Sequence, residues 1–443
     1  MRERLNFANK EKFRQKIGKT YLIACMAFYI ICIAVKGVFA AETRYLIEIW
    51  DLTQAQVQLA NTFYFITYGI VQILLFIFMA KIDIKKFTFV TIPISAILFI
   101  VMGLATNIQT MWILFALVGI FQASMFCATN YLLTKYLPRK LLPTANTLIA
   151  SGYAIGTALS YVISAFFVGF DLWRVPYFLI SGLVLISTVW LIYETKVIAR
   201  FNKLNTKLDS KQMLTESKDR MQEKDLPLQN NQKPIVALSN RKRIVIFYVV
   251  ILVLSLIVNG LYYGAMNFVT SILVDIYAFP QDASIYVSTI VPIIIILGPM
   301  ITIKSCEKHQ DFIKQGIKFL LIFLPFPILL TFFYKLNVIL YIVLIIVFLI
   351  LANGIRVIIN NVIAFKMKDY INVASFTAIT NAFASIAASA WPLIIALIKD
   401  NGSWGATYFT ISIMAVVIFI AAIIIDRIVN ATYKKDNNGE NLE

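Results

Sequence analysis

The chain has 443 residues, of which 60% are hydrophobic and only 14% are charged. Soluble globular proteins carry roughly 25% charged residues, so the composition excludes an ordinary soluble protein and indicates a membrane protein. The formal net charge of +17 would suggest a nucleic-acid partner in a soluble domain, but we expect none here, because the basic residues lie in the connections between apolar segments.

The predicted elements are apolar helices. A helix needs about 20 mostly apolar residues to cross the hydrocarbon core of a bilayer. The runs that meet this requirement are, in chain order, 21–41, 61–80, 87–106, 111–134, 147–169, 175–193, 244–273, 285–303, 319–334, 338–365, 373–398 and 405–425. Only the first and the tenth contain a charge, Lys36 and Arg356 respectively. We therefore expect an all-α membrane protein with twelve transmembrane helices.

The segment between the sixth and seventh runs differs in composition from the rest of the chain. Residues 196–243 are polar and rich in Lys, without an apolar face wide enough to bury, and such a composition predicts a cytoplasmic linker. The linker separates an N-terminal six-helix bundle, residues 1–195, from a C-terminal six-helix bundle, residues 244–443. Two such halves around a site at the middle of the membrane are typical of secondary transporters.

The distribution of Lys and Arg predicts the orientation. Nearly all of the 40 Lys and Arg residues lie in alternate connections, beginning with the N-terminal segment, whereas the other connections hold only Arg44, Arg174, Lys335 and Lys399. By the positive-inside rule, both termini are cytoplasmic. The basic N-terminal segment leads into a full-length span without a small-residue cleavage site, so we do not expect a removable signal. We expect a monomeric, multi-pass protein of the cell membrane, in bacteria the inner or plasma membrane.

Charges inside the apolar runs are the first functional signal, because a charge at the bilayer centre costs about 2.5–3.5 kcal/mol on insertion scales. Lys36 lies about 9 Å along the helix from Glu42, so its ammonium can either face a binding cavity or extend to the outer boundary. Arg356 lies about 15 Å from the inner boundary at Lys366, near the middle of the membrane. It needs a counter-anion, water or polar partners, and neighbouring carbonyls and amides such as that of Asn353 are the structural alternative.

The acidic residues sharpen this interpretation. None of the 23 Asp and Glu residues falls inside an apolar run: Glu42 and Asp275 lie at outer ends, and Glu194 and Asp426 at inner ends. The two cations then lack a buried carboxylate partner, and we expect a small anionic substrate to supply the counter-charge. The same absence argues against a proton relay through the membrane, and the only histidine, His309, lies in a cytoplasmic connection. Exchange or facilitated transport is therefore favoured over proton symport.

Four stretches carry a resemblance to a known family: "VKGVFAAE", "LTQAQVQLANTFYFITYGI", "GIFQASMF" and "FTAITNAFASIAAS". They are similar to the organophosphate:phosphate antiporters of the major facilitator superfamily, which include the glycerol phosphate and hexose phosphate transporters. The superfamily's signature between the second and third spans is partly present as "MAKIDIKK", with Met79 where Gly is expected. The resemblance implies exchange of a phosphate ester for phosphate. It also places Lys36 where these antiporters keep a substrate-binding Arg, and Tyr68 at a tyrosine that lines their site.

The chain departs from the family pattern in two places. The seventh helix offers Tyr262 and Tyr263 where these antiporters have an Arg, and the second helix has Gln72 where many have a Lys.

Some further candidates come from position alone. Tyr29 lies seven residues before Lys36, on the same helix face, and Gln122 is an amide in an apolar run; for both, packing is the alternative to substrate contact. The candidate substrate-binding residues are therefore Lys36, Arg356, Tyr29, Tyr68, Gln72, Gln122, Tyr262 and Asn353. The small residues Gly152 and Gly156 predict close packing of helices, with substrate contact as the alternative.

The sequence thus predicts a transporter of a small organic anion that works by alternating access, without a cofactor, metal or enzymatic activity. The four cysteines show no paired spacing that would form a metal or disulfide framework. No glycine-lysine loop for a nucleotide is present, which argues against a pump driven by ATP. Two alternatives stay open: a transporter-like membrane sensor of a metabolite, and a proton-coupled exporter of apolar compounds.

Overall fold

The computed structural model describes residues 2–78, 82–138, 141–216, 241–308, 312–363 and 373–439. These residues form helices joined by short turns, and none of them lies in a β-strand. Among them are 12 helical segments that are long and apolar enough to cross a membrane. The all-α class and the twelve spans predicted from the apolar runs are therefore confirmed.

The helices of the first half of the chain are α1 (Arg2–Trp50), α2 (Gln54–Phe78), α3 (Ile84–Gly103), α4 (Ile108–Gln122), α5 (Met125–Tyr136), α6 (Leu142–Val168) and α7 (Val175–Glu216). Those of the second half are α8 (Arg241–Tyr277), α9 (Gln281–Ile295), α10 (Leu297–Lys308), α11 (Phe312–Phe323), α12 (Pro325–Phe333), α13 (Val338–Val357), the π-helix η2 (Ile358–Val362), α15 (Val373–Asn401) and α16 (Trp404–Gly439). Some spans consist of two consecutive helices, as α4 and α5 do within Ile108–Tyr136.

Polar residues between the apolar runs begin several of these helices. The side chain of Asn107 accepts a hydrogen bond from the backbone N–H of Thr110 at 2.8 Å, and that of Asn337 accepts one from Ile339 at 2.8 Å. These bonds satisfy N–H groups that have no partner within the helix. The turns that separate the spans in the sequence are therefore also the caps of the helices that follow.

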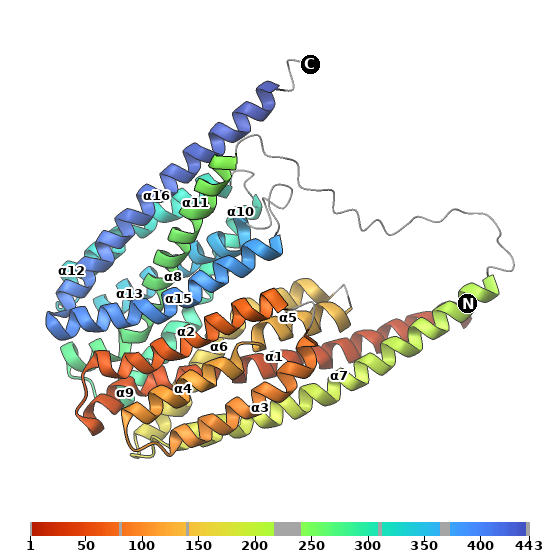
Figure 1. Ribbon diagram of the computed structural model, residues 1–443, viewed down its shortest axis with the longest axis horizontal. Helices are drawn as coiled ribbons and strands as arrows, with labels where there is room; N and C mark the ends of the chain where they lie inside the picture. The colour runs from red at the N-terminus through yellow and green to blue at the C-terminus, as the bar shows by residue number, and fades with distance from the viewer. Residues whose placement is uncertain are drawn as a thin grey trace.

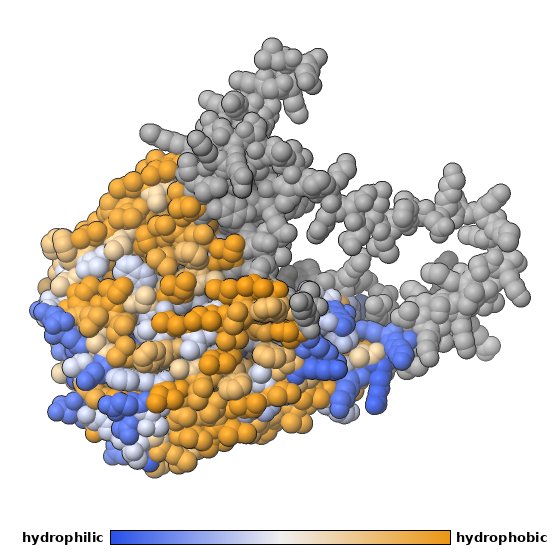
Figure 2. Space-filling model, in the orientation of Figure 1, coloured by the Kyte–Doolittle hydropathy of each residue, from blue (hydrophilic) through white to orange (hydrophobic). Residues whose placement is uncertain are grey.

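Each half of the chain has its own hydrophobic core, one centred on α1 to α7 and the other on α8 to α16. Within the first half, α1 and α6 approach closely, because a Cβ atom added to Gly156 would lie only 2.5 Å from the carbonyl oxygen of Ile30. This confirms the close helix packing predicted for Gly152 and Gly156. In Figure 2, the described surface between the two ends is mostly hydrophobic. Many large apolar side chains are exposed, for example Ile113 and Ile186, and such a surface suits contact with lipid chains.

The two halves meet at one end of the molecule, which we call the closed end, and their ribbons diverge toward the other, the open end, where α1 begins and α16 ends (Figure 1). Contacts of α2 with α15 and of α6 with α9 join the halves. At the closed end, Arg44 of α1 lies 3.3 Å from Asp275 of α8, and Lys399 of α15 lies 3.6 Å from the same carboxylate. The carboxylate of Asp400 accepts a hydrogen bond from the backbone N–H of Ala55, in the first turn of α2, at 2.8 Å.

The segment between the halves is described only in part. Helix α7 continues to Glu216, so residues 196–216 of the expected linker are helical, and α8 begins at Arg241. Residues 217–240 of the expected linker lie outside the described residues. His309 and the end of the tenth apolar run, residues 364–365, also lie outside them.

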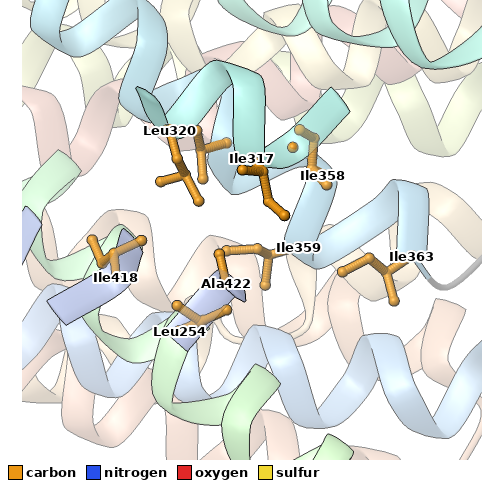
Figure 3. Close-up of a pocket in the computed structure, with 10 residues that line it drawn as sticks. Leu254, Ile317, Leu320, Ile358, Ile359, Ile363, Ile418 and Ala422 are labelled. Carbon is orange, nitrogen blue, oxygen red and sulfur yellow. The ribbon is translucent and has the colours of Figure 1, made fainter. Parts of the chain in front are cut away.

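A small cavity lies inside the second half, on the side of η2 (Figure 3). Its volume is about 50 Å³. Its lining consists of one glycine, Gly316, and apolar residues that come mainly from α8, α11, α13, η2 and α16, among them Leu254, Ile358 and Ile418. A lining without polar atoms does not hold water. This cavity therefore does not suit a polar substrate.

Candidate functional site

The two cations of the apolar runs lie against the same aromatic ring. The Nζ atom of Lys36, on α1, is 4.3 Å from the ring centroid of Tyr153, on α6, and the guanidinium carbon of Arg356, on α13, is 5.9 Å from that centroid. The two cations are therefore no farther apart than the sum of these distances. One comes from each half of the chain, so the structure brings together the two charges that the sequence placed 320 positions apart.

Aromatic rings form the rest of the surroundings. Lys36 also lies 5.4 Å from the ring of Phe65, and Arg356 lies 4.3 Å from the ring of Tyr262. The guanidinium donates a hydrogen bond to the hydroxyl of Tyr263 at 3.1 Å. The residues Lys36, Phe65, Tyr153, Tyr262, Tyr263 and Arg356 are called the two-cation cluster below.

The rings compensate the two charges in part. A cation over an aromatic face gains about 2 kcal/mol or more where water is excluded. Among the ion pairs described for this chain, none involves Lys36 or Arg356. The cluster is therefore a positively charged site with aromatic walls. Because no described ion pair neutralises its two cations, it can accept an anion.

The cluster lies between the two halves. The rings of Phe65 and Tyr263 are 5.9 Å apart and those of Tyr153 and Tyr263 are 6.1 Å apart, and each pair joins one half to the other. Both cations are half-buried, so neither is fully enclosed by the protein. A group bound here would contact both halves at once, which is the arrangement that alternating access requires.

Three candidates follow the cluster toward the open end. Tyr29, on α1, is 5% exposed, and its ring centroid lies 6.2 Å from that of Phe126. Tyr68, on α2, is partly exposed and stacks on Tyr64 with the ring centroids 5.8 Å apart. Gln72 lies one helical turn beyond Tyr68 and is partly exposed. These three residues lie outside the cluster, on its open-end side.

Gln122 makes its described hydrogen bonds within the first half. Its side-chain oxygen accepts from the hydroxyl of Tyr64 at 2.9 Å, and its side-chain nitrogen donates to the carbonyl of Cys32 at 3.5 Å. It is fully buried at the end of α4, where the fourth span changes from α4 to α5. Its contacts therefore favour the packing alternative.

Asn353 also has a structural contact. Pro299 has no N–H group, so the carbonyl of Ile295 lacks its usual partner four residues later, and Asn353 donates to this carbonyl at 3.2 Å. The side-chain oxygen of Asn353 is buried without a partner. Its donor therefore holds α13 against the break between α9 and α10, rather than facing Arg356.

Glu42 is buried, although it directly follows the first apolar run. Helix α1 does not end with the charge-free run but continues to Trp50, and the candidate span covers Gln15–Trp50. The side chain of Glu42 is 0% exposed; one oxygen accepts from the hydroxyl of Ser164 at 3.0 Å and the other has no partner. Charge alone marked the boundary in the sequence, whereas burial depends on the helices that pack around α1.

Sequence reasoning missed Phe65 and Tyr153 and gave Tyr263 no role in the site. Tyr153 lies beside Gly152, and the close packing of α6 on α1 turns this part of α6 toward Lys36. An aromatic residue next to a small residue at a helix contact was the available signal, but it is weak in a chain with 14% aromatic residues. Among the described residues, no group of His, Cys, Asp and Glu could hold a metal ion.

Comparison with known proteins agrees with the fold. The sequence profile of the Major Facilitator Superfamily matches residues 20–392. The chain therefore belongs to the Major Facilitator Superfamily, and it is a membrane transporter by its fold. Comparison with curated proteins gives no significant match.

Solved structures show the same fold. A bacterial homolog of the human lysosomal transporter Spinster, inward-facing and unoccupied, matches with a TM-score of 0.66 and 14% identity, covering 95% of this chain and 98% of that chain. The nucleoside transporter NupG matches with a TM-score of 0.62 and 14% identity, covering 91% of this chain and 98% of that chain. At this identity the likeness concerns the fold alone.

Proposed function

We propose that the chain transports a small anionic metabolite, with a phosphate ester exchanged for phosphate as the leading candidate. The observation that carries this proposal is the convergence of Lys36 and Arg356, one from each half, on the ring of Tyr153. Two cations beside one ring repel each other, and an anion between them removes that repulsion while gaining a charge-assisted hydrogen bond from each. The resemblance to organophosphate antiporters supports phosphate as the anionic group.

The transport cycle follows from the two ends of the molecule. The ion pairs around Asp275 and the bond from Ala55 to Asp400 hold the halves together at the closed end. With both termini in the cytoplasm, as the positive-inside rule predicts, the closed end faces outward and the site opens to the cytoplasm. Bound anion then links the halves while they rock to open the other end. We place the carrier in the cell membrane as a monomer.

Uptake into vesicles that contain the purified protein tests the exchange. We expect uptake of labelled phosphate ester to depend on phosphate loaded inside the vesicle and to be insensitive to a proton gradient. Uptake that ignores the internal anion and follows the proton gradient would contradict exchange. Binding of the ester without any uptake would instead support a membrane sensor.

Proton-coupled transport is a second candidate because of Glu42. A buried carboxylate with an unpartnered oxygen can take up a proton, and Glu42 lies on the same helix as Lys36, six positions later. Its described partner, Ser164, belongs to the same half of the chain, so the contact does not cross between the halves. The position of Glu42 therefore supports proton coupling less directly than the two-cation cluster supports anion binding.

A further inference from the structure

A chain of buried polar groups lies next to the two-cation cluster, on its open-end side. Ser255 and Asn259 belong to α8, and Asn360 belongs to η2. The hydroxyl of Ser255 lies 3.1 Å from the side-chain oxygen of Asn360 and 3.3 Å from the carbonyl of Thr380, on α15. The side-chain nitrogen of Asn259 donates to the carbonyl of Ser255 at 2.8 Å. Three elements of the second half thus meet at these residues.

The side-chain oxygen of Asn259 has no hydrogen-bond partner, although the residue is only 1% exposed. Turning the amide over would not relieve this, because the carbonyl of Ser255 can only accept and must face the amide nitrogen. A buried acceptor without a partner destabilises the protein by its full desolvation cost. The oxygen therefore lacks a donor, and a ligand can supply it.

The register of the helices places Asn259 one turn from the anion site. Asn259 precedes Tyr262 and Tyr263 by three and four residues, and Asn360 follows Arg356 by four, so each pair shares a helix face. Contacts of Tyr277 with Asn337 at the closed end and of Ser255 with Asn360 farther along show that α8 and α13 run antiparallel. Along α8, Asn259 lies one helical turn and Ser255 two turns from Tyr263, so Asn259 lies between the bond of Arg356 to Tyr263 and the contact of Ser255 with Asn360.

The backbone at this position is also unusual. The π-helix η2 begins two residues after Arg356 and contains Asn360, and its turn is closed by a bond from the N–H of Ile363 to the carbonyl of Ile358. A π-turn inside a transmembrane helix is rare and occurs frequently at functional sites. Here it sets the position of Asn360 against Ser255, one turn from the cation.

We propose that Asn259, supported by Asn360, binds a hydroxyl group of the substrate through the unpartnered amide oxygen. The substrate is then a hydroxylated anion, with its phosphate or carboxylate between Lys36 and Arg356 and its hydroxyl about one helical turn nearer the open end. This inference rests on the anion site of the proposed function and adds the chemical class of the uncharged end. The two-cation cluster thus binds the charged group of the substrate, and the amides bind its hydroxyl group.

Two phosphate esters of equal charge test the inference in purified protein. Glycerol 3-phosphate carries hydroxyls on its three-carbon chain and propyl phosphate carries none, so the ratio of their dissociation constants isolates the hydroxyl contribution. We expect Asn259→Ala to reduce the preference for glycerol 3-phosphate by roughly three- to tenfold, which is the range of one neutral hydrogen bond, and Asn360→Ala to reduce it less. The affinity for propyl phosphate should stay near that of the parent protein.

Asn401→Ala is the matched control, because Asn401 also donates to a carbonyl four residues earlier, that of Leu397, but lies exposed at the closed end. If Asn259→Ala does not give folded protein, Asn259→Ser removes the amide oxygen while its hydroxyl can still bond the carbonyl of Ser255. An unchanged ratio in the Asn259 and Asn360 variants overturns the hydroxyl subsite and leaves the anion site standing. Failure of both esters to bind the parent protein overturns the anion site, and the subsite with it.

Discussion

Neutralising one cation of the cluster should weaken anion binding without unfolding the carrier. We consider Lys36→Gln and Arg356→Gln. Each variant loses one charge-assisted contact with the anion, a contribution of about 1.5–3 kcal/mol, which corresponds to roughly a tenfold to more than a hundredfold loss of affinity. In the empty protein, loss of the cation–π contact with Tyr153 is offset by relief of the repulsion between the two charges. We therefore expect the melting temperature of the empty protein to change little.

Binding of a phosphate ester, measured by calorimetry or by the thermal shift that it produces, provides the assay. The double variant should lose less than the sum of the two single losses, because both cations contact one ligand. Lys36→Arg, which keeps the charge but changes the geometry of its donors, should bind better than Lys36→Gln. Lys86→Gln serves as the control, since the side chain of Lys86 is 82% exposed and outside the site.

The reasoning would be refuted by folded Lys36→Gln and Arg356→Gln proteins that bind and transport the ester like the parent. Lys36 would then only extend along the helix to the membrane boundary. Additive losses in the double variant would show that the two cations act at separate places, against their shared position beside Tyr153.

Three further predictions concern the rest of the fold. Glu42→Gln keeps an acceptor for Ser164 and should leave stability and anion exchange unchanged. Glu42→Ala removes this acceptor and should lower stability by about 1–3 kcal/mol. Loss of proton-driven uptake in Glu42→Gln would support proton coupling. Gly316→Ala should raise stability by about 0.5–1 kcal/mol, seen as a higher melting temperature, because its Cβ would meet Ile358 at an ordinary 3.8 Å beside the cavity of Figure 3. Asp275→Asn removes the carboxylate shared by Arg44 and Lys399, so labelling of a cysteine placed at the closed end should become faster; unchanged labelling would show that these ion pairs do not hold the halves together.

The sequence predicted the spans well because the bilayer imposes a single strong requirement on composition. The apolar runs identified the twelve candidate spans found among the described residues, and the two charges within these runs, Lys36 and Arg356, lie at the contact between the halves. The same rule did not predict that Glu42 is buried. A helix ends where its hydrogen bonds and its packing end, not where the first charge appears, and α1 continues for eight residues beyond Glu42.

The walls of the site could not be derived in the same way. Phe65, Tyr153 and Tyr263 belong to three different helices, and only the packing of those helices brings the rings of Phe65 and Tyr153 each within about 6 Å of the ring of Tyr263. An isolated tyrosine in an apolar run is compatible with core packing, lipid contact or a site. The unpartnered oxygen of Asn259 is likewise a property of the packed structure. A donor placed nearby by a different packing would satisfy this oxygen, and the sequence does not show whether one is present.

The aromatic walls change how the lack of a carboxylate beside the two cations is interpreted. From the sequence, two buried cations without acidic partners required a substrate anion to compensate them. In the structure, the rings of Tyr153 and Tyr262 already compensate each cation in part. Partial compensation suits a carrier better than a complete ion pair would. A carboxylate beside Lys36 or Arg356 would compete with every incoming anion, whereas a ring leaves the charge available and still allows the empty site to persist while the halves move. Replacing Tyr153 by Leu, which removes the ring beside both cations, should therefore destabilise the empty carrier more than the anion-bound one, and a larger ligand-induced thermal shift in Tyr153→Leu than in the parent protein is the expected result.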